Sequence, residues 1–571
     1  MQRSSACSYQ VRPCDPMAAR ELGRALELSP ALAQVLLHRG LNDTAQAREF
    51  LLPQLAGLSA PDAMRDRSLA ADRLASAIRR RERIAVFGDY DVDGTTSAAI
   101  LAGILEQLGG QVHVRVGNRF DGGYGLSDIA LDRLLESSPQ VLVTCDCGSS
   151  DHERIARATS LGIDVIVVDH HLVPAQPLPA FAFLNPHRPE CGYEYKGLAS
   201  AGLVLVLGAA VRAALGVKLD LRDWLDLVAL GTIADVAPLD GDNRRLVRAG
   251  LMRLGSDQCR PGIVALRELS RLRARPKNWA ISAVDVAFRM TPRLNAAGRM
   301  GDPALTLALL RATALTQARQ LAAQIEQQND ERKATERRVT EATFAQVIEC
   351  YGAAPSCGVI AAAEDFHRGV VGISAARVVD RFAVPAIVIA IEGEHAHGSA
   401  RAPDGFPLYD AIARCAPLLT RFGGHHAAAG MTLRADKLEQ FRAAFADATR
   451  ELGQQDGQGG VPLADVALEP SVFELPAPVD LLRLEPVGQA NAEPVFLVPE
   501  AKVVECGSVR GAHLKLQLRL GGRSLGAFGY DMPETRVEPG QTVQLLGHLR
   551  IDDWNGGDRV EMRLLAPPLT S

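Results

Sequence analysis

Acidic side chains and histidines gather in four short motifs in the first half of the sequence. Carboxylates and imidazoles suit hard to borderline divalent cations such as Mn²⁺ or Mg²⁺. Two such ions about 3.5–4 Å apart can activate water and hold both reacting oxygens of a phosphoryl group. The motifs therefore predict hydrolysis of a phosphate ester or anhydride. They are residues 89–94 (Asp-Tyr-Asp-Val-Asp-Gly), 145–148 (Cys-Asp-Cys-Gly), 169–171 (Asp-His-His) and 231–235 (Gly-Thr-Ile-Ala-Asp).

The first motif also resembles the opening of a calcium-binding EF-hand loop. With Asp89 at position one, Ile100 falls at position twelve, where such a loop requires a bidentate Glu. A predicted strand, rather than a helix, precedes the motif. We therefore reject the calcium interpretation.

Short apolar segments alternate with helical segments around these motifs. This rhythm is typical of βαβ units and predicts an α/β domain with a parallel sheet. Three of the motifs directly follow predicted strands, and open sheets bind ligands beyond the carboxyl ends of their strands. We expect the carboxylates to converge on one crevice, where their mutual repulsion requires cations. The predicted strands are residues 84–87, 111–116, 141–144 and 163–168.

The downstream sequence predicts a connector and two further domains. Residues 312–349 are highly charged and contain no helix breaker, which predicts one long, rigid helix. Polar–apolar alternation over residues 513–520 and an Asn-Gly turn at 555–556 predict a small antiparallel β-barrel. A second α/β domain lies between them. Its predicted strands are residues 359–363, 385–391 and 395–401.

These segments set the predicted domain boundaries. A Gly-rich linker at residues 453–460 separates the barrel from the second α/β domain. The predicted units are an N-terminal cap on the domain that follows (residues 1–60), a catalytic domain (61–310), a connecting helix (311–350), a substrate-binding domain (351–452) and a β-barrel domain (461–571).

The charge balance restricts how the chain could bind a polyanion. The 571 residues include 62 basic and 67 acidic side chains, so the net charge is -5. This excludes a generally cationic nucleic-acid binder, and any phosphate-binding surface must be local. Residues 260–299 carry nine basic against two acidic side chains. This excess predicts a groove that tracks phosphates; the alternative is a solvated helical face.

Cysteine usage and hydropathy predict a cytoplasmic protein. The ten cysteines form no Cys-x-x-Cys pair of the kind that binds zinc. Free thiols are typical of the reducing cytosol. The N-terminus lacks the apolar segment of a signal peptide, and the most apolar run, residues 197–211, is too short to cross a bilayer.

At the four motifs the chain resembles the DHH phosphoesterases. Residues 292–299, 366–373 and 423–425 resemble further motifs of the RecJ branch of that family. The resemblance covers nearly the whole chain and includes a terminal OB-fold. It implies a metal-dependent 5′→3′ exonuclease that hydrolyses single-stranded DNA to mononucleotides in DNA repair and recombination. It also implies two Mn²⁺ or Mg²⁺ ions and, as partners, a single-strand-binding protein and a RecQ-type helicase. The multi-domain plan fits a monomer.

The resemblance also implies roles for individual residues. His171 would contact the scissile phosphate, Asp169 would support the histidines, and both would be catalytic together with Asp146. The implied metal ligands are Asp89, Asp91, Asp93, Asp146, His170 and Asp235. The implied DNA- and phosphate-binding residues are Arg293, Asn295, Arg299, His367, Ser399, Arg401 and His425. In one departure from the family pattern, Ala402 stands where a serine usually follows Arg401.

Two other functions fit the motifs. A DHH-type phosphodiesterase or pyrophosphatase would act on short oligonucleotides or small phosphate compounds and would not need the barrel. A non-enzymatic scaffold should have lost metal ligands, yet every motif carboxylate is present, so we reject it. Aromatic residues of the barrel could stack on bases or fill its core. They are Phe496, Phe528, Tyr530 and Trp554.

Overall fold

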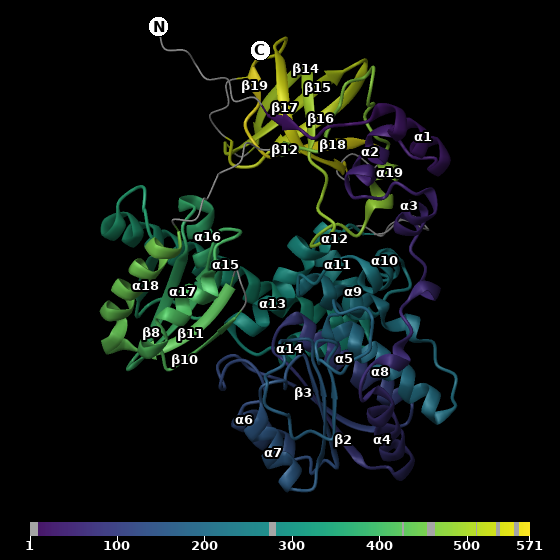
Figure 1. Cartoon of the computed structure of the whole chain (residues 1–571), viewed down its shortest axis with the longest axis vertical. Helices are drawn as coiled ribbons and strands as arrows, with labels where there is room; N and C mark the ends of the chain where they lie inside the picture. The colour runs from purple at the N-terminus through teal and green to yellow at the C-terminus, as the bar shows by residue number, and fades with distance from the viewer. Residues whose placement is uncertain are drawn as a thin grey trace.

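The computed structural model describes residues 9–272, 281–424, 428–453, 463–509, 511–532, 537–552 and 559–570. Figure 1 shows a first α/β domain, a second one beside it, and a C-terminal β module that lies against the N-terminal helices. A long helix, α15, joins the two α/β domains. The predicted fold class is therefore confirmed.

The first domain is built on five parallel strands in the order β3-β2-β4-β5-β6. From β2 the chain first adds β3 on one side of that strand and then crosses back to add β4 on the other side. The carboxyl ends of β2 and β4 therefore flank a switch point, where open sheets bind ligands. The sequence did not predict β6, which is too short to show a pattern. The strands are β2 (Arg83–Gly88), β3 (Gln111–Val116), β4 (Val141–Cys145), β5 (Asp164–Val168) and β6 (Ala182–Leu184).

Helices cover both faces of this sheet. One apolar core lies between the sheet and α5, α8 and α9, and a second lies between the sheet and α6 and α7. Helix α5 is buried along almost its whole length, because α8 and α9 pack on its outer side. The helices are α4 (Arg67–Arg80), α5 (Val92–Gln107), α6 (Asp128–Leu135), α7 (His152–Ser160), α8 (Ser200–Leu215), α9 (Leu225–Ala234), α10 (Gly241–Gly255), α11 (Pro261–Leu269), α12 (Ala283–Asp285), α13 (Thr291–Met300) and α14 (Ala304–Arg311).

Helix α15 (Leu315–Tyr351) belongs to both α/β domains. Its first half buries Ala318 and Ile325 in the core of the first domain. Its second half buries Val339 and Val347 against the second domain. Apolar anchors at both ends make the helix a rigid strut between the two domains, as its sequence predicts.

The second domain contains a mixed sheet in the order β10-β11-β9-β8-β7. Only β7 and β8 run parallel; the other neighbours are antiparallel. The strands are β7 (Val359–Ala363), β8 (Ala386–Glu392), β9 (His395–Arg401), β10 (Arg421–Gly424) and β11 (Ala428–Arg434). The helices are α16 (Val371–Phe382), α17 (Leu408–Arg414) and α18 (Leu438–Leu452).

The C-terminal module has a seven-stranded sheet in which β14 pairs with both β15 and β17. The prediction of wholly antiparallel pairing is wrong at two places, because β13 runs parallel to β14 and β16 runs parallel to β18. Residues 454–460 of the linker predicted at 453–460, and the Asn555-Gly556 turn, lie outside the described residues. The elements are β13 (Val466–Ala467), α19 (Pro478–Leu484), β14 (Phe496–Val509), β15 (His513–Leu520), β16 (Arg523–Gly529), β17 (Thr542–Ile551), β18 (Val560–Leu564) and β19 (Leu569–Thr570).

The N-terminal helices share their apolar core with the C-terminal module. Buried side chains of α1 (Pro16–Leu26), α2 (Pro30–His38) and α3 (Thr44–Leu51) belong to the same cluster as the barrel strands. Near the chain start, β1 (Gln10–Val11) pairs in parallel with β12 (Leu463–Ala464). The two ends of the sequence therefore form one folded unit (Figure 1).

Within the described ranges, no helix combines the length and apolar character needed to cross a membrane. The cysteines in this part of the chain are all free thiols.

Candidate metal centre and nucleic-acid interface

The sheet edge brings the predicted ligands together. Asp146 directly follows β4, and His170 lies just beyond β5. Asp93 lies in the first turn of α5, and Asp235 caps the C-terminus of α9. Parallel strands and converging helix ends thus place four side chains from distant motifs in one cluster.

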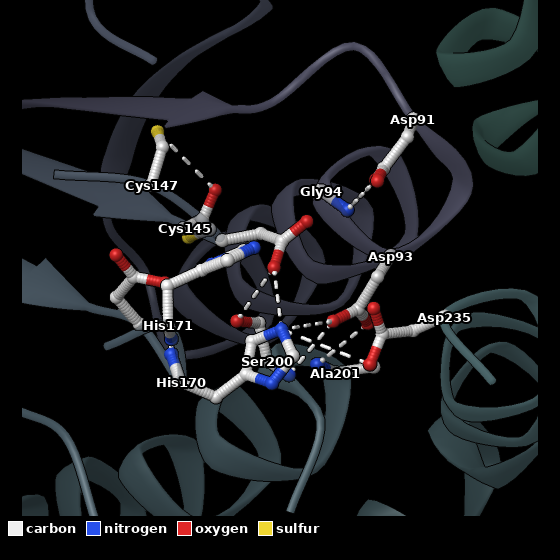
Figure 2. Close-up of polar contacts among 12 residues, drawn as sticks. Asp91, Asp93, Gly94, Cys145, Cys147, His170, His171, Ser200, Ala201 and Asp235 are labelled. Atoms are coloured by element: carbon white, nitrogen blue, oxygen red, sulfur yellow. Dashed lines mark hydrogen bonds and ion pairs between the residues drawn. The ribbon is translucent and has the colours of Figure 1, made fainter. Parts of the chain in front are cut away.

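His170 lies at the centre of this cluster (Figure 2). Its Nε2 atom lies 3.2 Å from Asp146 Oδ1, 3.7 Å from Asp235 Oδ2 and 4.0 Å from Asp93 Oδ2. Two groups of potential ligand atoms fit a cation: Asp93, His170 and Asp235, and Asp146, His170 and His171. The shared histidine indicates two neighbouring cation positions.

Backbone and hydroxyl donors hold two of the carboxylates. The start of α8 donates to Asp93: Ser200 N to Oδ2 at 2.8 Å and Ala201 N to Oδ1 at 3.0 Å. The Ser200 hydroxyl donates to Asp146 Oδ1 at 3.1 Å. Asp146 itself lies in the left-handed region, with φ of 65°. Such strain is typical of functional positions, because the surrounding structure must enforce it.

The surroundings of one histidine nitrogen in the cluster show that a cation fits here. His170 Nε2 is buried, and it has no hydrogen-bond partner among the described residues. Burial, with a smaller effect of His171, lowers the pKa of His170 to about 4. The imidazole is therefore neutral near pH 7, which is the form that binds metals. A buried, neutral nitrogen surrounded by three carboxylates fits a divalent cation.

Without a cation, the carboxylates hold protons unusually tightly. Burial and then Asp91 raise the pKa of Asp93 to about 7, and burial and then Asp93 raise that of Asp235 to about 9. Burial also raises the pKa of Asp146 and Asp89 well above the usual range. A bound divalent cation reverses this effect, because its charge stabilises ionised ligands.

We therefore expect metal binding to release protons. The apparent affinity for Mn²⁺ should fall as the pH falls from about 8.5 to about 6.5, by up to about tenfold per pH unit for each proton released. Titration calorimetry in two buffers of different protonation enthalpy measures this release. An Mn²⁺ affinity that does not change with pH would contradict the proposed ligand set.

Two predicted ligands lie outside both ligand groups. Asp91 is the N-cap of α5, and its Oδ1 accepts from Gly94 N at 2.9 Å (Figure 2). Asp89 is buried after β2, and its Oδ1 accepts from Gly125 N at 3.3 Å. Both are close enough to affect the cluster electrostatically, and Asp91 raises the pKa of Asp89. Their role as ligands remains a proposal.

Asp169 and His171 form a hydrogen-bonded pair beside the cluster. Asp169 Oδ1 lies 2.8 Å from His171 Nδ1, and the same oxygen accepts from His170 N at 2.8 Å. Burial opposes ionisation of Asp169, but the His171 hydrogen bond holds its pKa below the usual range. Burial lowers the pKa of His171, yet Asp169 more than compensates and raises it to about 9. Without a cation, this arrangement favours a protonated His171, whereas ligation of a metal by this imidazole would require its neutral form.

Arginines from both domains meet beside this site. Arg299 on α13 donates to Gly369 O at 3.3 Å in the second domain. Its pKa is lowered to about 10 by burial and then by three other arginines, Arg119, Arg332 and Arg401. Within the described residues, Arg119, Arg299 and Arg401 form no ion pair with a carboxylate. Partly buried guanidinium groups without a carboxylate counter-ion indicate an anion site.

The second domain completes this anion site. Arg401 Nη1 donates to Ser399 Oγ at 3.1 Å. A Cβ on Gly372 would lie 2.8 Å from Ser399 Oγ and 3.2 Å from Arg401 Nη2, so both side chains lie at the start of α16. Helix N-termini of this kind bind phosphate groups. Ala402 packs instead against the apolar core of this domain.

Other predicted phosphate-binding residues have different surroundings. Arg293 forms an ion pair with Glu326 on α15 at 2.7 Å, which fixes α13 to the strut. His367 Nδ1 accepts from Gly369 N at 3.1 Å, and its ring meets that of Phe120 edge-on at 5.9 Å. Asn295 is partly buried on α13. His425 lies outside the described residues.

The basic segment 260–299 is largely used inside the protein. Arg260 forms an ion pair with Asp226, and Arg289 forms one with Asp285. Arg267 donates to backbone carbonyls at the end of α10 and just beyond it. Three further basic side chains of the segment, Arg273, Arg275 and Lys277, lie outside the described residues. Sequence counting cannot separate internal arginines from phosphate-binding ones.

Sequence reasoning missed Arg119. The sequence of residues 122–125 (Gly-Gly-Tyr-Gly), which includes Tyr124, fits a substrate loop and a turn equally well. The Arg119 guanidinium stacks on the Tyr90 ring at 4.5 Å. The Tyr124 hydroxyl donates to Asp146 O at 3.2 Å and lies 3.0 Å from His171 Nδ1. Both residues follow β3, so the strand-end rule that located the carboxylates could have located them.

Aromatic side chains of the C-terminal module divide into core and surface. Phe496 is fully buried, which removes it from the stacking candidates and assigns it to the core. Tyr530 is 53% exposed, and the centroid of its ring lies 4.7 Å from that of Phe528. The guanidinium carbon of Arg563 lies 4.8 Å from the centroid of the Tyr530 ring. Trp554 lies outside the described residues.

Comparisons with known proteins agree with this geometry. Residues 83–232 match the DHH family N-terminal domain, residues 356–451 the DHHA1 domain, and residues 464–566 the RecJ OB domain. The single-stranded-DNA-specific exonuclease RecJ of Escherichia coli is 34% identical over 94% of this chain and 95% of its own. That of Dickeya dadantii is 36% identical over 86% of this chain and 88% of its own.

Solved structures of similar proteins contain metal. RecJ from Thermus thermophilus in complex with Mn²⁺ has a TM-score of 0.79 and 29% identity, covering 98% of this chain and 78% of its own. An exonuclease RecJ bound to manganese has a TM-score of 0.60 and 31% identity, covering 70% of this chain and 98% of its own. By its sequence, domain order and metal-site geometry, this chain belongs to the RecJ family of DHH proteins.

Proposed function

We propose that this protein is a divalent-metal-dependent exonuclease that hydrolyses single-stranded DNA from the 5′ end to mononucleotides. One observation carries the proposal: a buried carboxylate–imidazole cluster lies beside arginines that come from two domains and have no carboxylate partner among the described residues. Bound Mn²⁺ or Mg²⁺ would activate water and neutralise charge on the phosphoryl group. Asp93, Asp146, His170 and Asp235 would hold these ions, with Asp89 and Asp91 beside them.

The protein's own residues would bind and position the substrate. Arg299, Ser399 and Arg401, aided by Arg119, would hold the terminal phosphate and so position the adjoining phosphodiester over the cluster. His171, oriented by Asp169, would donate a hydrogen bond to the scissile phosphate. Contacts to phosphates rather than to base edges leave the reaction independent of sequence.

The C-terminal module favours a polymer over a small phosphate compound. Tyr530, Phe528 and Arg563 offer an exposed aromatic and cationic surface suited to stacking on bases. We place this protein in the cytoplasm, in DNA repair and recombination, acting as a monomer with a single-strand-binding protein and a RecQ-type helicase as partners.

A time course on an oligonucleotide labelled at either end tests the proposal. With Mn²⁺, we expect mononucleotides to be released from the 5′ end of the single strand, but not from its duplex or in EDTA. Cleavage of dinucleotides or pyrophosphate without attack on the polymer would assign the site to small substrates instead.

The terminal phosphate contact gives a separate prediction. Arg401→Ala should lower kcat/KM on 5′-phosphorylated single strands about thirtyfold, because a charge-assisted hydrogen bond is lost. Activity on the 5′-hydroxyl strand should change far less. Arg434→Ala serves as the control, because Arg434 is exposed on β11 of the same domain. Equal losses on both strands would show that Arg401 does not bind the terminal phosphate.

A further inference from the structure

Val236 has an unusual backbone conformation directly beside the metal cluster. It follows Asp235, and its φ is 60°. Its N–H donates to Ile233 O at 3.2 Å, and that of Ala237 donates to Thr232 O at 3.2 Å, which closes the end of α9. Glycine is favoured at this position of a helix end, because a Cβ is strained in the left-handed region. A β-branched residue there is an outlier.

Packing does not offset this strain. The Val236 side chain is 67% exposed, whereas the neighbouring Ala237 and Leu239 are buried. Strain that the fold enforces without burying the side chain is typical of functional positions, where it serves a role other than stability.

The position of Val236 indicates what this role is. On one side, the Oδ2 atom of the preceding Asp235 lies 3.7 Å from His170 Nε2. On the other, Leu239 N donates at 2.8 Å to Gln489 O, in the segment of the C-terminal module between α19 and β14. Val236 is therefore exposed on the stretch of chain that joins the metal cluster to the module. A strand that ran along this stretch would reach both the metal cluster and the module.

A second exposed apolar side chain directly follows the Asp-His-His motif in sequence. Leu172 follows His171 and is 71% exposed. Aliphatic side chains have no favourable contact with phosphate oxygens, but they pack well on the faces of bases. Two such side chains beside the metal ligands thus suit the apolar part of a nucleotide.

We propose that Val236, together with Leu172, is a substrate-contact residue that packs on the base of the nucleotide being cleaved. The inference rests on the proposed exonuclease function. It explains why the chain keeps valine where glycine would be less strained. It also assigns to this nucleotide a contact that does not depend on base identity.

The test compares Val236→Asn with Val236→Leu. Asparagine tolerates the left-handed region and removes the apolar group, whereas leucine keeps it. For Val236→Asn we expect the KM for single-stranded DNA to rise about tenfold, while kcat changes by less than about twofold. The melting temperature should not fall. Val236→Leu should retain the wild-type KM, and Leu172→Asn should act like Val236→Asn.

An abasic terminal nucleotide provides the decisive readout. The wild type should bind this substrate more weakly than the normal strand, and Val236→Asn should lose most of that difference. Val217→Asn, an exposed valine just beyond α8, serves as the matched control. An unchanged KM for Val236→Asn, or a lower melting temperature with equal losses on both substrates, would overturn the inference. A wild type that does not digest single strands would instead overturn the proposed function.

Discussion

Asp146→Asn is expected to abolish metal-dependent hydrolysis, with a loss of at least about a thousandfold in kcat. Asp146 is the one carboxylate of the group that it forms with His170 and His171, and its Oδ1 atom lies 3.2 Å from the histidine that both groups share. An amide is a much weaker ligand for a hard cation. The measurement is nucleotide release at saturating Mn²⁺ by the full-length variant.

Stability separates this loss from misfolding. In EDTA, Asp146→Asn should not lower the melting temperature, because burial and neighbouring carboxylates already disfavour the charged form of Asp146. The amide oxygen can still accept from the Ser200 hydroxyl. The rise in melting temperature on adding Mn²⁺ should shrink in the variant. Asp62→Asn, whose side chain is 91% exposed, is the control. Surviving activity would refute the two-metal proposal.

His171→Ala is expected to lower kcat about a hundredfold to a thousandfold. The Asp169 carboxylate orients this imidazole through a 2.8 Å contact at Nδ1, and alanine removes the group that faces the phosphate. Asp93, Asp146, His170 and Asp235 remain to bind metal. Single-turnover digestion and Mn²⁺ calorimetry measure the two effects separately.

Two further variants serve as comparisons for His171→Ala. His395→Ala, at an exposed position on β9, should leave kcat unchanged. Tyr124→Phe should give a smaller loss than His171→Ala, because it removes only the hydroxyl 3.0 Å from Nδ1. If His171→Ala weakened Mn²⁺ binding as strongly as it lowered kcat, His171 would be a metal ligand rather than a phosphate contact.

Local sequence was sufficient to predict that the candidate metal ligands lie together at one sheet edge. Asp146 and His170 each lie at the end of an apolar strand, and parallel strands end at one sheet edge. Because this rule depends on short segments and their order, it needs no knowledge of distant contacts. The long helix could also be predicted from local sequence, since residues 315–351 contain no glycine or proline.

Sequence patterns did not reveal how the parts are used together. Arg293 and Arg299 lie on the same helix, six residues apart, yet Arg293 pairs with Glu326 while Arg299 joins the anion site. Which arginine keeps a free guanidinium depends on carboxylates far away in the chain. Likewise, α1–α3 pack on the barrel rather than on the domain that follows them in sequence.

By itself, the sequence determined the chemistry of the site, the class of each domain and their order, because strands, helices and ligand types are encoded locally. The tertiary structure decided which charges remain unpaired, where the N-terminal helices pack, and that Val236 is exposed beside the metal ligands. These features arise from contacts between segments far apart in the chain, and no local pattern records such contacts.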